Sequence, residues 1–153
     1  MRHAGAVFVG ALPGIWLGLV VAISFIETPL KFRAPGITLE RGLGIGRIVF
    51  HALNSVELAL GAILLVALFA LGTDVGSLAR WAIVFACAAL LVQMIALRPV
   101  LDRRLDARVA GEQVESSAHH VIYIGLEVAK AGALATATIA LAAAAARASE
   151  GSA

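Results

Sequence analysis

The chain has 153 residues, of which 61% are hydrophobic and 14% charged, and its mean hydropathy is +0.95. A soluble domain of this size cannot bury so much apolar surface, because a small domain has a high ratio of surface to volume. The composition excludes a soluble globular protein, and the net charge of +2 resides in loops beside apolar stretches, which argues against a nucleic-acid partner.

Four apolar stretches follow one another, over about residues 6–30, 45–71, 78–97 and 118–146. Each has the roughly 20 residues that a helix needs to cross a hydrocarbon core of ~30 Å. They lack the period-2 alternation of barrel strands, and only helices or closed barrels satisfy the backbone in lipid. We therefore predict an all-α protein, an antiparallel four-helix transmembrane bundle that forms one domain over residues 1–153.

The first stretch is longer than the apolar core of a cleaved signal peptide, so it is predicted to stay in the protein. Gly10, Gly14 and Gly18 fall four residues apart within it. Glycines at this spacing clear one helix face, on which a neighbouring helix can pack closely. We expect these three residues to form a helix-packing face.

Lysine and arginine are concentrated on one side of the predicted bundle. The first and third loop regions hold Lys31, Arg33, Arg41, Arg47, Arg98, Arg103, Arg104 and Arg108, whereas the opposite side holds Arg2, Arg80 and Arg147. Cytoplasmic loops of membrane proteins carry the excess of basic residues. The pattern predicts a multi-pass protein of the inner (plasma) membrane, with both long loops in the cytoplasm and both termini outside.

The two halves of the chain share a pattern. In each half a stretch that contains a tryptophan, Trp16 or Trp81, precedes a loop that opens with a proline, Pro29 or Pro99. The next stretch carries a histidine and then a glutamate, which are His51 and Glu57 in one half and His120 and Glu127 in the other. A duplicated helical hairpin with a pseudo-twofold axis along the membrane normal is one interpretation. The other is that proline and arginine commonly end membrane helices.

Polar side chains form a stripe along the predicted fourth helix. At 100° per residue, His120 and Glu127 differ by only about 20° in direction, and Tyr123 and Lys130 lie within roughly 80° of His120. A charged residue near the centre of a spanning helix costs about 2.5–3.5 kcal/mol on insertion scales. We therefore expect the stripe to face the interior of the bundle.

The other three helices carry polar residues that are predicted to face the same region. On the second helix His51, Asn54 and Glu57 step by three residues. Glu27 lies late in the first helix, and Gln93 lies in the third. Besides the histidines and the glutamates at 57 and 127, the predicted polar core comprises Glu27, Asn54, Gln93, Tyr123 and Lys130.

One chemistry that suits this core is the binding of a divalent metal ion, because imidazole and carboxylate ligands bind zinc, iron or Cu(II). The candidate ligands are His51, His120, Glu57 and Glu127. His119 points about 100° away from His120 and is predicted to be dispensable. Neither histidine–glutamate pair has the Glu-x-x-His spacing of di-iron bundles. The alternative is that the protein has no cofactor.

Two further interpretations need no metal. Buried carboxylates and histidines serve as proton or ion relays in membranes, although four helices leave little room for a conduit without oligomerisation. In a structural role, Glu127 and Lys130 neutralise each other at i, i+3, and the amides link helices by hydrogen bonds. Glu57 then requires a proton or a partner across the bundle. A structural, assembly or membrane-interaction role is our main prediction, with metal-ion or proton handling as the alternative.

The sequence contains no phosphate-binding glycine loop, no H-E-x-x-H, no CxxC and no nucleophile elbow, so an enzyme is disfavoured. The predicted partners are the lipid bilayer and either a second copy of the chain or a larger membrane complex.

Short motifs distributed over most of the chain carry a resemblance. They are Trp16-Leu17-Gly18, Pro29-Leu30-Lys31-Phe32, Phe50 in the second helix, Pro99 at the end of the third and His120 at the start of the fourth. In these motifs the chain resembles a family of small bacterial four-helix membrane proteins of unknown function. That family is similar to a eukaryotic transmembrane protein associated with copper handling and cisplatin resistance, so the resemblance implies a link to copper. The methionine- or cysteine-rich ligands of Cu(I) transport are missing from a sequence with one Cys and two Met.

Overall fold

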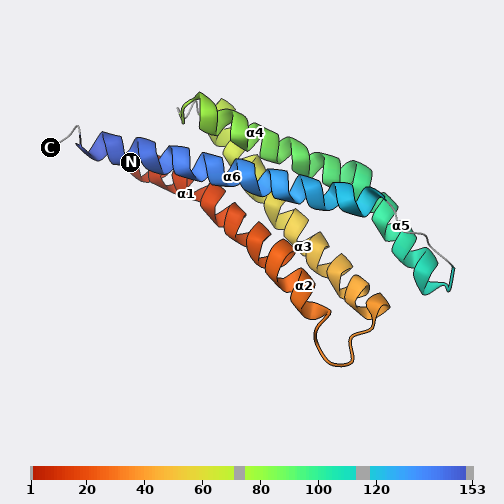
Figure 1. The fold of residues 1–153 in the computed structure, drawn as a ribbon. Helices are drawn as coiled ribbons and strands as arrows, with labels where there is room; N and C mark the ends of the chain where they lie inside the picture. Colours follow the sequence, from red (N-terminus) through yellow and green to blue (C-terminus); the bar gives the residue numbers. More distant parts are fainter. Residues whose placement is uncertain (1, 71–74, 113–117, 151–153) are drawn as a thin grey trace.

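The structure, a computed structural model, describes residues 2–70, 75–112 and 118–150. Four long helical rods run antiparallel, so the two chain ends lie at the same end of the molecule (Figure 1). Helices of membrane-spanning length and composition cover Val9–Lys31, Leu39–Phe69, Ser77–Val109 and Ala118–Ser149. Within the described residues there is no strand. The predicted all-α four-helix bundle is confirmed.

Over the described residues the rods consist of nine helical segments. They are α1 (Arg2–Val20), the π-helix η1 (Val21–Glu27) and α2 (Thr28–Lys31); α3 (Leu39–Leu65) and η2 (Val66–Ala70); α4 (Ser77–Val92), η3 (Gln93–Leu97) and α5 (Arg98–Val109); and α6 (Ala118–Glu150). The third rod extends twelve residues beyond the predicted end at 97, as the charged segment α5. The second rod begins at Leu39 rather than near 45, because the Thr38 side chain caps it by accepting a hydrogen bond from the Arg41 N–H at 3.3 Å.

Both prolines that open the long connections follow a π-helical segment. Before Pro29, the Thr28 N–H donates to the carbonyl of Ile23, and before Pro99 the Arg98 N–H donates to the carbonyl of Gln93. A proline ring clashes with the carbonyl four residues earlier and has no N–H to donate, and the widened turn accommodates it. This shared geometry supports the hairpin duplication, which stays a prediction.

The apolar core lies in the half of the bundle nearest the termini. Its largest members come from all four rods and include Leu12, Trp16, Val20, Leu64, Ile83, Leu90 and Leu134. Among the rods, α4 and α6 pack together most extensively. At the other end the hairpin of α2 and α3 diverges from α5 and α6 (Figure 1).

The predicted glycine face packs closely at one position only. A Cβ atom added to Gly14 would lie 3.3 Å from Cγ2 of Thr138 on α6. At Gly10 and Gly18 an added Cβ would meet none of the described atoms outside its own turn within 4 Å, which corrects the prediction for these two residues. Gly61 of α3 also approaches the first rod closely, because a Cβ there would lie 3.3 Å from the Trp16 ring.

Candidate functional site

Lys130 is the centre of a buried network of ion pairs and hydrogen bonds. Its Nζ lies 2.6 Å from Oε1 of Glu57 on α3 and 3.0 Å from Oε1 of Glu127, one turn earlier on α6. Nζ also donates to Oε1 of Gln93 in η3 at 3.0 Å. The side chains of Lys130 and Glu57 are completely buried. Glu57 therefore finds its partner across the bundle, and Glu127 pairs with Lys130 at i, i+3.

The remaining contacts of the network come from the first and third rods. The Trp16 indole N–H donates to Oε1 of Glu57 at 2.8 Å, and the Ser24 hydroxyl donates to Oε2 of Glu127 at 3.0 Å. The Gln93 amide donates to Oε1 of Glu127 at 3.0 Å and to the backbone carbonyl of Tyr123 at 3.4 Å. One connected network thus joins all four rods.

Three buried polar atoms beside this network have no hydrogen-bond partner among the described residues: Oε2 of Glu57, Oδ1 of Asn54 and the hydroxyl of Tyr123. Asn54 lies one turn before Glu57 on α3. The Tyr123 ring packs edge-on against Phe50, also on α3, with 5.8 Å between ring centroids. Buried polar groups are nearly always satisfied in native proteins, so the protonation and pairing of these atoms need a physical explanation.

The structure differs from the predicted polar core at three residues. Glu27 stays outside the network, because its carboxylate pairs with Lys31 at 3.2 Å and is about one-third exposed. Trp16 and Ser24 belong to the network but were not predicted to. An indole N–H in a membrane helix needs an acceptor, and this signal could have identified Trp16. Ser24 carries no comparable signal.

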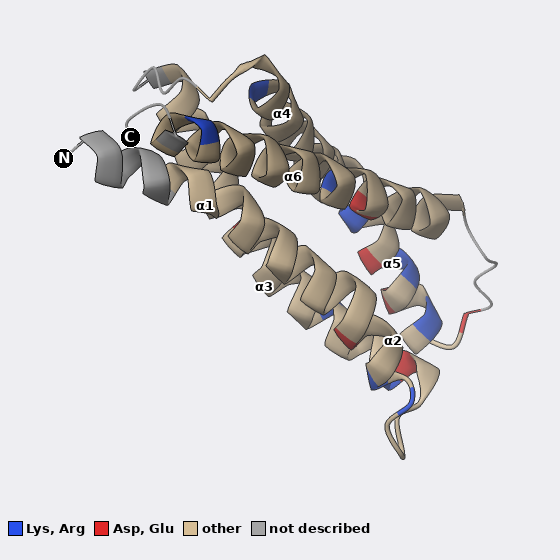
Figure 2. Cartoon of the chain, turned by 60° about the vertical axis from the view of Figure 1, so that its left-hand side comes forward, with Lys and Arg blue, Asp and Glu red and all other residues tan. Residues whose placement is uncertain are grey.

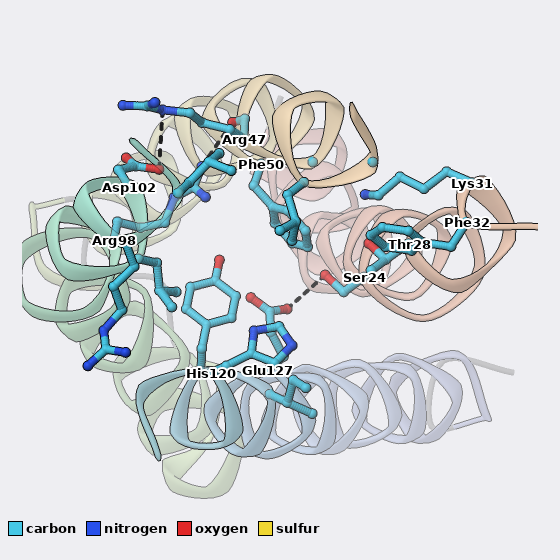
Figure 3. Close-up of a pocket in the computed structure, with 18 of the residues that line it drawn as sticks. Ser24, Thr28, Lys31, Phe32, Arg47, Phe50, Arg98, Asp102, His120 and Glu127 are labelled. Atoms are coloured by element: carbon cyan, nitrogen blue, oxygen red, sulfur yellow. Dashed lines mark hydrogen bonds and ion pairs between the residues drawn. The ribbon is translucent and has the colours of Figure 1, made fainter. Parts of the chain in front are cut away.

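A cavity of about 670 Å³ opens between the two hairpins, at the end opposite the termini (Figure 3). Its walls are mainly apolar side chains, among them Phe25, Phe32, Leu43, Phe50, Leu101, Leu105, Val121 and Ile124. Ser24 and Glu127, which also line it, connect the cavity to the buried network. Figure 3 shows Glu127 and His120 of α6 pointing into the space enclosed by the four rods.

Basic residues surround this cavity. Figure 2 shows lysine and arginine concentrated on α2, α5 and the loop after α2. The cavity lining includes five basic side chains, Lys31, Arg47, Arg98, Arg104 and Arg108, and two acidic ones, Asp102 and Glu127. Acidic partners neutralise part of this charge. Arg47 pairs with Asp106 at 2.6 Å and with Asp102 at 3.4 Å, and Lys31 pairs with Glu27.

Arg98 is the basic residue of the cavity wall that is withdrawn furthest from solvent, with 8% of its surface exposed. Its Nη2 donates to the backbone carbonyl of Arg47 at 3.2 Å, and its guanidinium lies over the Phe50 ring, 5.6 Å from the centroid. Its Nε has no hydrogen-bond partner among the described residues. A buried guanidinium with a free donor is a preorganised anion-binding group.

The four predicted metal ligands are not gathered into one site. His51 contacts Asp102 at 3.2 Å with a side chain 60% exposed, and His120 lines the cavity. Glu57 and Glu127 share Lys130. No group of three or more His, Cys, Asp or Glu side chains in the described parts of the chain is placed to hold a metal ion.

Comparisons with protein families, with curated proteins and with solved structures give no match for this chain. The resemblance to the copper-associated family accordingly remains a prediction, and the inference of function rests on the cavity and the buried network.

Proposed function

We propose that this membrane protein binds a small amphipathic anion, which enters the cavity from the arginine-rich end of the bundle. The single observation that carries the proposal is Arg98, a buried guanidinium in the cavity wall whose Nε lacks a partner. An anionic head group would supply the missing acceptor.

The size and the walls of the cavity support an organic ligand rather than a simple inorganic ion. Ligand pockets usually enclose about 300–1,000 Å³ and are lined by apolar and aromatic side chains with a few placed polar groups. This cavity of about 670 Å³ has that composition, with Phe25, Phe50 and Ile124 among its apolar residues. The apolar walls suit a hydrocarbon segment, and the basic residues suit the head group.

The charge of the lining selects for anions. The lining has five basic and two acidic side chains, and Glu27 and Asp106 outside the lining neutralise part of the charge of Lys31 and Arg47. The two acidic members already have basic partners, because Asp102 contacts Arg47 and Glu127 contacts Lys130. A cavity of one charge sign with low-dielectric walls raises the local concentration of oppositely charged ligands.

The charge distribution also supports an orientation of the protein in the membrane. The basic end of the bundle belongs in the cytoplasm by the positive-inside rule, which would place both termini outside and the protein in the plasma membrane. The ligand would then come from the cytosol or from the inner leaflet. Basic pockets between transmembrane helices on that side are common sites for anionic lipid head groups.

The other predicted roles have weaker support. An assembly role would be favoured by polar groups that need a partner chain, whereas Glu57 and Glu127 find their ionic partner, Lys130, within this chain. Metal handling would need ligands that surround one point, whereas His51, His120 and their glutamates are not gathered into one site. Proton handling is compatible with the buried network, whose charges do not balance.

The proposal is tested by calorimetric titration of the purified protein, in nanodiscs of phosphatidylcholine, with dodecyl phosphate. Arg98→Gln should weaken binding about 10- to 100-fold, since a charged hydrogen bond contributes about 1.5–3 kcal/mol. Arg103→Gln is the matched control, because Arg103 is exposed on the same helix and does not line the cavity. Equal affinity in both variants, or equally tight binding of dodecanol, would contradict the proposal.

The source of the anion is determined by a second arm of the experiment. Native mass spectrometry of protein from nanodiscs that contain phosphatidylglycerol should show a retained lipid if the head group is a membrane lipid. Retention lost in Arg98→Gln and kept in Arg103→Gln would assign the lipid to the cavity. Binding of dodecyl phosphate without lipid retention would assign a soluble amphiphile.

A further inference from the structure

The charges of the buried network do not balance. Glu57 and Lys130 have no exposed surface, and Glu127 is 2% exposed. Two carboxylates therefore share one ammonium group, which leaves a net charge of −1 if both are ionised. An uncompensated charge in a low-dielectric interior is strongly unfavourable, and buried groups usually gain or lose a proton instead.

Hydrogen bonding identifies the oxygen atom that can take the proton. Oε1 of Glu57 accepts from Trp16 and Lys130. Oε1 of Glu127 accepts from Gln93 and Lys130, and its Oε2 accepts from Ser24. The fourth carboxylate oxygen, Oε2 of Glu57, is buried and receives no hydrogen bond among the described residues.

We infer that the Glu57–Lys130–Glu127 cluster is a proton-binding site that holds one exchangeable proton on Oε2 of Glu57. The proton removes the net charge and turns an unpartnered acceptor into a donor. Asn54, one turn earlier on the same helix, offers Oδ1, a buried acceptor that also lacks a partner. Residues three apart on a helix are neighbours, so Oδ1 of Asn54 is the candidate acceptor for this proton.

The surroundings favour a proton over a metal cation. Hard cations take six or more oxygen ligands, whereas the buried side-chain oxygens that lack a partner among the described residues belong to Glu57, Asn54 and Tyr123. Neither Glu57 nor Asn54 lines the cavity. The cluster therefore binds a proton rather than a metal ion.

None of the other groups that face the cluster competes with its carboxylates for the proton. The first rod contributes Trp16 and Ser24, and η3 contributes Gln93, none of which titrates in the physiological range. Tyr123 on α6 is a weak acid. On α4 the thiol of Cys87 lies 4.0 Å from the carbonyl of Gly61, one turn after Glu57.

Glu127 gives the site access to water. It lines the cavity and contacts Lys130, which contacts Glu57 in turn. A proton from the cavity can therefore reach the cluster without crossing the apolar core. The proton site does not depend on the ligand proposed for the cavity.

The test is infrared spectroscopy of the purified protein at neutral pH in dodecyl maltoside, a detergent without a carbonyl group. The wild type should show the C=O stretching band of a protonated carboxylic acid, and the band should shift on transfer to D₂O. Either Glu57→Gln or Glu127→Gln should abolish the band, because one carboxylate then balances Lys130. Glu27→Gln is the control that keeps it, since Glu27 pairs with Lys31 outside the cluster.

The position of the proton is tested by Asn54→Ala. Loss of the acceptor should move the band to higher wavenumber without removing it. A wild type without the band, or a band that survives in both glutamine variants, would overturn the proton site. An unshifted band in Asn54→Ala would overturn its assignment to Oε2 of Glu57.

Discussion

The two ends of this bundle are built differently, although the same four rods run through both. Near the termini, Trp16, Leu64, Ile83 and Leu134 pack into a closed apolar core. At the other end the rods diverge around a cavity of about 670 Å³ with a basic lining. The network of Lys130 lies between these regions. The ligand proposed for this protein would bind at the open end, because the apolar core closes the other end.

The buried network forms the boundary between the apolar core and the cavity. It depends on charge compensation, whereas the core depends on apolar packing. Trp16 belongs to both, because its ring lies in the apolar core and its indole N–H donates to Glu57. Ser24 and Glu127 link the network to the cavity in the same way. Changes at the boundary should therefore affect both ends, and changes within one end should stay local.

The largest effect is expected from Lys130→Met. The variant leaves Glu57 and Glu127 buried without their ammonium partner, and breaking a buried pair from one side typically costs about 3–5 kcal/mol. Reversible unfolding in mixed micelles measures the loss. Glu57→Gln, which replaces the protonated carboxyl group by a neutral amide and leaves Glu127 paired with Lys130, should be at least as stable as the wild type. A Lys130→Met variant as stable as Glu57→Gln would contradict the charge argument.

A smaller effect is expected from Gly61→Val, which acts on the closed end. A Cβ at Gly61 lies 3.3 Å from the Trp16 ring and 3.2 Å from the Cys87 sulfur, so a larger side chain pushes the first and third rods away. Overpacking of this kind costs about 1–3 kcal/mol. The matched control is Gly44→Val on the same helix, where an added Cβ meets no described atom within 4 Å. If unfolding experiments show equal losses for both variants, Gly61 is not a packing contact.

The smallest expected effect is the difference in unfolding free energy between alanine substitutions at Gly18 and at Gly14 on the first rod. Gly18→Ala should raise the unfolding free energy by about 0.5–1 kcal/mol, because alanine has the higher helix propensity and an added Cβ meets open space there. Gly14→Ala should gain less, since its Cβ must displace Thr138. Both are measured in the same unfolding assay. An equal gain at both positions would contradict close packing at Gly14.

Much of the fold followed from the sequence because the signals are local. Apolar runs of about membrane thickness predicted four helices and their antiparallel order. Helical periodicity placed His120, Glu127 and Lys130 on one stripe, and the Glu127–Lys130 pair forms at that spacing. The concentration of basic residues at one end was also visible, because it depends only on the order of residues along the chain.

The tertiary structure decided which of these side chains meet. Periodicity fixes which residues share a helix face, but the rotation and separation of the rods depend on packing between them. Those two variables placed Trp16 and Ser24 in the network and left Glu27 outside it. Of the three glycines predicted to form a packing face, they brought only Gly14 into close contact with another helix. The divergence of the rods created the cavity and buried Arg98 in its wall, because no local pattern specifies the distance between two hairpins.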